Sequence, residues 1–152
     1  MDDRVKLHMQ LLSFGITAGL IGGVINFLVA PLFAELHILS LFGVNISPTF
    51  SKAGLYHNGF WGALWGVAFM VPWHKYFGSW SLRAFIIGLL PAAVQLFLIF
   101  PLSGAGFGGI SLGICMPLFV ILFNTIFFSF PGYAWFTLTG LDSDATPEWM
   151  AL

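Results

Sequence analysis

Charged side chains are nearly missing from this sequence. Only 7% of its 152 residues are Asp, Glu, Lys or Arg, whereas a soluble domain carries about 25%. Residues 84–141 include none of these four types, and a soluble domain cannot keep such a surface hydrated. A lipid bilayer accepts it, because hydrocarbon replaces water around the molecule. The sequence therefore predicts an integral membrane protein.

Other absences narrow the function classes. Cys115 is the single cysteine, so the sequence offers no disulfide framework. The five basic residues form no patch and the net charge is −1, which argues against nucleic acid as a partner. Glu35 is the only acid between Asp3 and Asp142, whereas a proton-coupled carrier usually holds a carboxylate inside a span. With no paired carboxylates and no Ser/His/Asp set, the sequence predicts no enzyme.

Long apolar runs are what the sequence does contain. Four segments approach the roughly 20 residues that a membrane-spanning helix needs, namely 11–33, 55–71, 83–102 and 114–138. Residues 34–50 are amphipathic instead, with Leu36, Leu39 and Phe42 spaced by three, and predict a short helix on the outer surface that Pro48 ends. We expect an all-α membrane protein in which one transmembrane domain, residues 1–152, is built from two tandem helical hairpins.

Basic residues predict the orientation, because cytoplasmic loops carry the excess of Lys and Arg. Arg4 and Lys6 precede the first segment, and Lys75 and Arg83 lie between the second and the third. On the opposite side, the connections contain only one basic residue, Lys52. Both termini are therefore expected in the cytoplasm.

An internal repeat is visible in the apolar segments. Residues 22–32 align with 92–102 at an offset of 70, and both end in Phe-Leu-x-x-Pro-Leu. A weaker alignment at an offset of 66 matches Asn58 with Asn124. A duplication predicts a pseudo-twofold four-helix bundle whose axis follows the membrane normal. Chance similarity is the alternative, because apolar sequences share Leu, Phe and Val freely.

Small residues recur every fourth position in three of the segments. The glycines are Gly15, Gly19 and Gly23 in the first segment, Gly62 and Gly66 in the second, and Gly88 in the third. Such stripes let helix backbones approach closely. They indicate either packing within the chain or an interface with another copy or another membrane subunit.

Four amide side chains fall inside the predicted spans: Asn26, Asn58, Gln95 and Asn124. Polar groups are costly within a membrane, so each one suggests a role. If they face one another, they can hydrogen-bond between helices and hold them together. The alternative is a polar pathway or a ligand site.

Two histidines lie on the predicted outer side. His57 precedes Asn58 at the outer end of the second segment, and His37 belongs to the amphipathic stretch. An imidazole there can bind a ligand or sense pH, or it can simply contact lipid headgroups. Two histidines without a carboxylate or thiolate predict no metal site. Haem or a pigment held by His57 is a further alternative.

The third apolar segment carries a resemblance to a known family. Residues 88–104 begin with Gly-Leu-Leu, contain Gln-Leu-Phe and end in Phe-Pro-Leu-Ser-Gly. Together with residues 18–24 and His57, this stretch resembles the YagU-like small bacterial inner-membrane proteins. The outer loop is shorter here, and Asn124 stands where that family tends to keep a histidine. The resemblance implies a four-helix fold in a bacterial inner membrane and brings no activity with it.

Three functions follow from these patterns. The first is a non-enzymatic accessory or structural subunit that associates with other membrane subunits or with itself, as the glycine stripes suggest. The alternative is a small channel or carrier for a neutral solute, with the four amides lining its path. A membrane subunit that holds haem or a pigment is the second alternative. The lipid bilayer is the common partner of all three.

Overall fold

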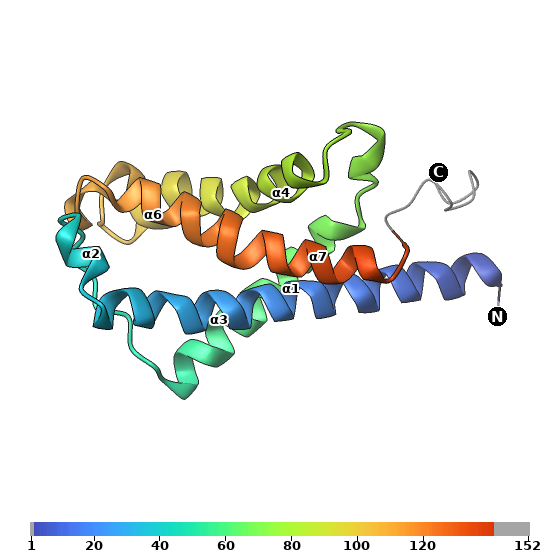
Figure 1. Cartoon of the computed structure of the whole chain (residues 1–152), viewed down its shortest axis with the longest axis horizontal. Helices are drawn as coiled ribbons and strands as arrows, with labels where there is room; N and C mark the ends of the chain where they lie inside the picture. The colour runs from blue at the N-terminus through green and yellow to red at the C-terminus, as the bar shows by residue number, and fades with distance from the viewer. Residues whose placement is uncertain (1, 142–152) are drawn as a thin grey trace.

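The chain folds into long helices joined by short connections, as the computed structural model shows (Figure 1). Residues 2–141 are described, so Met1 and residues 142–152 of the predicted domain lie outside the described part. Within it every regular element is a helix. The α-helices are α1 (Asp3–Glu35), α2 (Ile38–Leu41), α3 (Lys52–Trp65), α4 (Trp80–Val94), α5 (Phe100–Leu102), α6 (Met116–Leu122) and α7 (Phe130–Leu138).

Tighter and wider helical turns continue several of these α-helices. The 3₁₀ turns are η1 (Gly66–Met70), η2 (Trp73–Lys75) and η4 (Phe107–Leu112). Two π-helical turns, η3 (Gln95–Ile99) and η5 (Phe123–Ser129), join α4 to α5 and α6 to α7 without a break in the helix. The all-α prediction is therefore confirmed for the described residues.

Three of the helices are long and apolar enough to cross a membrane, by length and composition. They are Asp3–Glu35, Trp80–Leu102 and Met116–Leu138, close to the predicted segments 11–33, 83–102 and 114–138. An integral membrane protein is the class that these helices support.

The predicted second segment, 55–71, is built differently. Its α-helix ends at Trp65, and η1 continues it as a 3₁₀ helix to Met70. Pro72 fixes the end, because a residue before proline is forced into an extended conformation, and Val71 has φ −67° and ψ 133°. The indole Nε1 of Trp73 donates to the carbonyl oxygen of Ala68 at 2.7 Å, which satisfies one of the last carbonyl groups.

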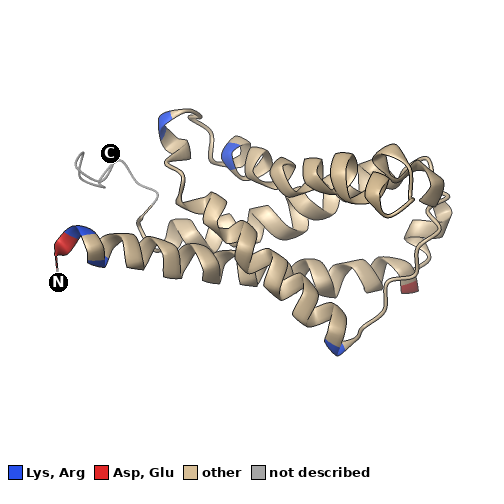
Figure 2. Ribbon diagram, turned by 180° about the vertical axis from the view of Figure 1, so that it is seen from behind, with Lys and Arg blue, Asp and Glu red and all other residues tan. Residues whose placement is uncertain are grey.

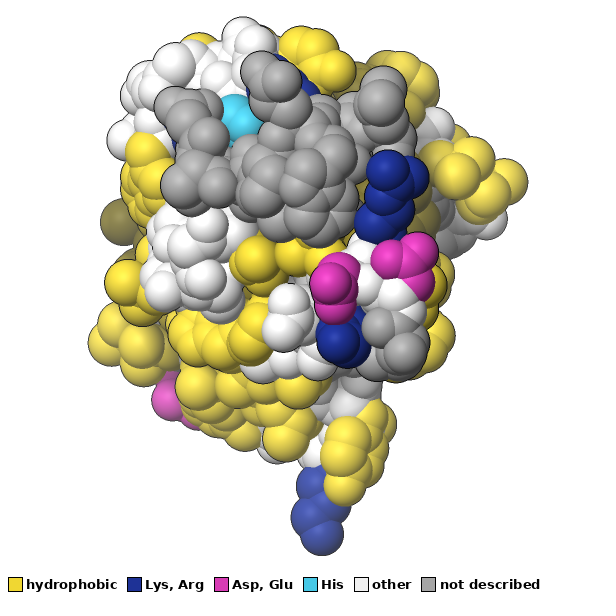
Figure 3. All heavy atoms as spheres, turned by 90° about the vertical axis from the view of Figure 1, so that its right-hand side faces the viewer, with side chains coloured by type: hydrophobic (Ala, Val, Ile, Leu, Met, Phe, Trp, Pro, Cys, Tyr) yellow, Lys and Arg dark blue, Asp and Glu magenta, His cyan; other side chains and the backbone are white. Residues whose placement is uncertain are grey.

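The two ends of the molecule are distinct. At one, here called the terminal end, α1 begins, α7 ends and the connection 71–79 turns back (Figure 1). The opposite, loop end holds the connections 36–51 and 103–115. Charged residues lie toward these two ends, and the helices between them carry none (Figure 2). Figure 3 views the terminal end, where charged side chains gather while apolar ones cover the flanks.

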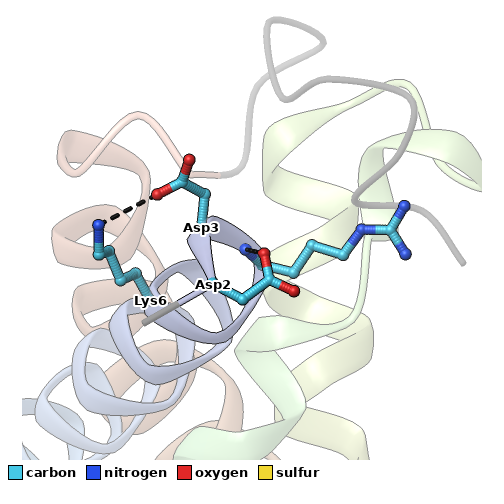
Figure 4. Close-up of polar contacts among 4 residues, drawn as sticks. Asp2, Asp3 and Lys6 are labelled. Carbon is cyan, nitrogen blue, oxygen red and sulfur yellow. Dashed lines mark hydrogen bonds and ion pairs between the residues drawn. The ribbon is translucent and has the colours of Figure 1, made fainter.

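The terminal end is capped by local polar contacts. The Asp2 side chain accepts a hydrogen bond from the backbone N–H of Arg4 at 3.3 Å, which caps α1 (Figure 4). Lys6 pairs with Asp3 at 3.1 Å, and both side chains are exposed, so this pair adds little stability. Arg83 donates to the carbonyl oxygens of Phe77 and Gly78, at 2.7 and 3.0 Å, and so ties down the connection 71–79.

The amphipathic segment 34–50 forms a much shorter helix than predicted. Helix α2 stops at Leu41, well before Pro48. Gly43, with φ +68°, ends it in a Schellman motif in which the Val44 N–H donates to the carbonyl oxygen of Leu39 at 2.9 Å. Leu39 and Val44 are both buried in one apolar cluster, so the motif also anchors the loop end.

Helix α1 is central to the packing. It lies against α3 and η1 on one side and against η5 and α7 on the other, while α4 packs on η5 (Figure 1). Two apolar clusters result. The loop-end cluster contains Leu39, Val44, Ala92, Leu96, Phe100, Met116, Phe119, Val120 and Phe123. The terminal-end cluster contains Ala18, Phe69, Ala84, Ile87, Phe128, Tyr133 and Phe136.

Glycines bring α1 and α3 into direct backbone contact. A Cβ at Gly19 would overlap the carbonyl oxygen of Gly62 and would lie 2.6 Å from Cα of Gly66. Gly15 faces Gly66 and Gly23 faces Gly62 in the same way, one turn to either side. The two stripes predicted from the sequence therefore face each other inside the chain.

The remaining glycine of the prediction, Gly88, packs in the other half of the molecule. A Cβ there would lie 2.5 Å from the carbonyl oxygen of Asn124 and 2.6 Å from Cα of Thr125. Its contact is thus also within the chain, between α4 and η5.

Candidate functional site

A cavity of about 620 Å³ lies among the long helices, in the half nearer the loop end. Residues of α1, α3, α4 with η3, and α6 with η5 line it, and Ile46 and Pro48 of the connection 36–51 contribute as well. Its volume falls within the range of about 300–1,000 Å³ that is typical of small-molecule sites. Its lining contains no Asp, Glu, Lys or Arg.

All four amides predicted from the sequence line this one cavity. Asn26 comes from α1, Asn58 from α3, Gln95 from η3 and Asn124 from η5. Counted along their helices from the loop end, the four lie at similar depths of about 9–14 Å, at 1.5 Å per residue. Four helical segments therefore each bring one amide to a common level.

Two of the amides are hydrogen-bonded to each other. Asn124 Nδ2 donates to Gln95 Oε1 at 3.2 Å and to the carbonyl oxygen of Val120 at 2.9 Å. Asn58 Nδ2 instead donates within its own helix, to the carbonyl oxygen of Gly54 at 2.9 Å. Bonding between helices thus accounts for the Gln95–Asn124 pair and leaves the other two amides without this role.

Polar capacity remains in the cavity wall. Asn26 Oδ1 is buried and accepts no hydrogen bond from the described residues, a state that costs about 1–3 kcal/mol. Asn26 is also a lining residue of the cavity, and the χ2 torsion of asparagine is broad, so its amide has freedom to turn. Gln95 uses its carbonyl oxygen for Asn124, and its NH₂ group donates to none of the described residues. The amides of the wall therefore keep both acceptor and donor capacity for a ligand.

The two histidines do not meet at the cavity. His57 lines it from α3 and is exposed, with its ring centroid 6.3 Å from that of Trp61. His37 lies at the junction of α1 and α2 with φ +59° and is not part of the lining. Among residues 2–141 no cluster of three or more His, Cys, Asp or Glu is found that would hold a metal ion.

Stacked aromatic rings lie between the cavity and the terminal end. Phe69 stacks on Tyr133 and on Phe136, with ring centroids 6.0 and 6.2 Å apart, and Trp80 stacks on Tyr133 at 5.8 Å. Phe69, Tyr133 and Phe136 are at most 1% exposed. We call Phe69, Trp80, Tyr133 and Phe136 the aromatic plug. They pack with Trp65 and Phe128 of the cavity wall in the terminal-end cluster.

Sequence reasoning missed the apolar part of this site. Trp65 and Phe128 form walls of the cavity, and both pack against residues of the plug in the terminal-end cluster. These residues belong to helices that are apolar nearly all round, so periodicity does not tell which face points inward. The abundance of aromatic residues was visible, but their meeting point was not.

Comparison of the chain with protein-family models, with curated proteins and with solved structures found no match. The resemblance to YagU-like proteins is therefore neither supported nor refuted and stays a prediction.

Proposed function

We propose that this protein binds a small neutral molecule within the membrane and acts as a carrier or binding protein for it. The observation that supports this most is the convergence of four amides, one from each of four helical segments, on a single cavity of about 620 Å³. Polar side chains inside a membrane are expensive and usually mark function. Here only one pair of them is engaged in holding two helices together.

A neutral ligand fits the chemistry of the lining. A charged ligand in a membrane interior needs a counter-charge, and the lining supplies none. Amides both donate and accept hydrogen bonds, so they match hydroxyl, carbonyl or amide groups. Trp61, Trp65 and Phe128 provide apolar area for the rest of the molecule.

The aromatic plug favours a carrier or a binding protein over an open channel. On the terminal-end side of the cavity, Phe69 and Tyr133 are both 0% exposed and stack at a centroid distance of 6.0 Å, which argues against a permanently open path there. Release toward the terminal end would therefore need the plug residues to move apart.

The membrane topology belongs to the same proposal. With 14 α-helical and five 3₁₀-helical residues, α3 and η1 together extend about 31 Å, close to the hydrocarbon thickness of about 30 Å. We take them as a fourth crossing, which completes a four-helix bundle. The excess of Lys and Arg at the terminal end supports a cytoplasmic position for that end. The membrane that we propose is a bacterial inner membrane.

The subunit hypothesis stays an alternative, supported by the scarcity of charged residues and the lack of a reactive set of side chains. It also relied on glycine stripes as interfaces, and these glycines make their contacts within the chain. Association with other subunits or with copies of itself needs a different surface. The haem or pigment hypothesis has one exposed imidazole, His57, at the cavity and no second histidine beside it.

The proposal is tested by asking what the purified protein retains. Wild type and the double variant Asn58→Leu/Asn124→Leu are extracted into polymer discs, and the bound small molecules are identified by mass spectrometry. Wild type is expected to retain a neutral compound at near-stoichiometric amounts, and the double variant to retain at least tenfold less. Thr17→Leu is the control, because Thr17 bonds only within its own helix and lies outside the cavity. Equal retention by all three proteins would contradict the proposal.

A further inference from the structure

The cavity reaches the surface between α3 and η3. His57 and Trp61 of α3, and Leu98 and Ile99 of η3, line the cavity and are also exposed. Trp61 is 42%, Leu98 54% and Ile99 46% exposed. Helix α3 diverges from α4 toward its N-terminus (Figure 2). These four residues are called the mouth.

With the loop end taken as one surface of the membrane, the mouth lies at the depth where headgroups give way to hydrocarbon. Ile99 is about 5 Å from the loop end of its helix, and Trp61 is about 14 Å from the start of α3, at 1.5 Å per residue. The headgroup layer of one leaflet is about 5–8 Å thick. The mouth therefore begins beside the headgroups and continues beside the acyl chains.

Polarity changes from the mouth inward. Trp61, Leu98 and Ile99 make the mouth apolar apart from the imidazole of His57. Behind it lie the amides, with the unused oxygen of Asn26 and the unused NH₂ group of Gln95. A hydroxyl group can donate to the first and accept from the second. A polar head would thus sit inside while an apolar chain passes out through the mouth.

Resting on the proposed function, we infer that the ligand is a neutral amphiphile that comes sideways from the lipid, with its hydroxyl-bearing head on the amides and its chain between α3 and η3. A water-soluble solute has no need of an apolar mouth facing acyl chains. An ionic lipid has no counter-charge in the lining. Neutral head, single chain and lateral access are the three parts of the inference.

A photoreactive monoacylglycerol, with a diazirine in its acyl chain, tests lateral access. The whole protein is reconstituted in phosphatidylcholine discs and labelled by light, and the modified peptides are mapped by mass spectrometry. We expect saturable labelling at the mouth that unlabelled monoacylglycerol competes and that glycerol at the same concentration does not. Labelling that never saturates, or that glycerol competes equally well, would overturn the inference.

A pair of variants shows whether the mouth is the route. Leu98→Trp places a bulky ring in the mouth and should lower saturable labelling at least fivefold. Leu102→Trp is the matched control on the same helix, because Leu102 is 80% exposed and lies outside the cavity lining. Both positions are exposed, so both variants should elute from size exclusion like wild type. Equal labelling of the two variants would overturn the inference.

The outcome separates this inference from the function on which it rests. If monoacylglycerol fails to label the mouth while wild type still retains a water-soluble neutral compound that Asn58→Leu/Asn124→Leu loses, the cavity binds a solute and only the lateral route is wrong. If wild type retains nothing more than the double variant does, the proposed function itself is wrong.

Discussion

The two helical hairpins of this molecule are held together in different ways. In the first, α1 meets α3 and η1 backbone to backbone along three successive levels of glycine contacts, and α1 is regular α-helix from Asp3 to Glu35. In the second, each helix contains a π-helical turn. Gly88 contacts the backbone of Asn124 and Thr125, and the side chains of Asn124 and Ser129 also hydrogen-bond across to the other helix. The comparison suggests a rigid wall on one side of the cavity and an adjustable wall on the other.

The π-helical turns explain why the second hairpin is the adjustable one. A π turn inserts an extra residue into the helix, disturbs its hydrogen-bond ladder and is often found at functional sites. Gln95 is the first residue of η3, and Asn124 lies within η5. Among residues 2–141, the only hydrogen bond found between two side-chain amides is the one from Asn124 to Gln95. It therefore joins the two π turns.

The aligned halves of the predicted repeat differ in local structure. Residues 25–29 are regular α-helix, whereas the aligned residues 95–99 form η3. Gly22 and Gly23 also align with Ala92 and Ala93, so only the first copy has close glycine contacts at these positions. An ancestral duplication stays a prediction, and the structure shows how far the two halves differ where their sequences align.

Among the substitutions considered for the two hairpins, the one at the central glycine of the first hairpin, Gly19, should lower stability the most. Gly19→Ala sets a Cβ against the backbone of Gly62 and Gly66, and such overpacking costs about 1–3 kcal/mol. For a chain of this size that is a fall of about 3–10 °C in Tm, measured by heating in detergent followed by size exclusion.

A matched alanine on the facing helix provides the control for Gly19. At Gly59 a new Cβ would meet only Leu20 Cδ1, at 3.2 Å, which is the end of a flexible side chain. Gly59→Ala should therefore leave Tm unchanged or raise it, since alanine is the better helix former. If Gly19→Ala is as stable as Gly59→Ala, the backbone contact is not what holds the first hairpin.

The equivalent substitution in the second hairpin should cost less. Gly88→Ala also meets backbone atoms, of Asn124 and Thr125, but this contact stands beside a π turn that can shift, with no glycine row to hold it in register. We expect a Tm decrease about half that of Gly19→Ala in the same assay. A larger decrease than Gly19→Ala would reverse the assignment of rigid and adjustable walls.

One buried hydroxyl joins the helices of the second hairpin. Ser129 is 0% exposed, and its Oγ donates to the carbonyl oxygen of Ala84 at 2.6 Å. Ser129→Ala should lower stability by about 1 kcal/mol. Thr137→Val is the control, because Thr137 bonds only to Ala134 of its own helix. Equal Tm values for the two variants would mean that this hydroxyl contributes nothing to the contact.

The smallest effect is expected for the amide pair. Gln95→Leu, Asn124→Leu and the double variant form a cycle whose coupling should be about 0.6 kcal/mol, as is typical of hydrogen bonds between membrane helices. Unfolding in a detergent and denaturant mixture measures it. A coupling near zero would remove the amide bond as a link between the π turns, and would leave Gln95 and Asn124 free to serve a ligand alone.

The sequence predicted the class and most of the helices correctly. The charge-free stretch 84–141 and the apolar runs fixed a helical membrane protein, with three helices close to the expected ranges. It also named the four amides, because an amide stands out in an apolar segment. It misjudged the segment 34–50, where a glycine with positive φ ends the helix early, and it took 55–71 as a continuous α-helix.

Composition and segment length by themselves determined that the protein belongs to the membrane, since transfer of an apolar helix into lipid depends little on its neighbours. Only the tertiary structure decided which faces meet. Helices that are apolar nearly all round carry no directional signal, so the glycine contacts, the π turns and the meeting of Asn26, Asn58, Gln95 and Asn124 emerge only when the helices are packed together. The cavity is a property of that packing and of no single segment.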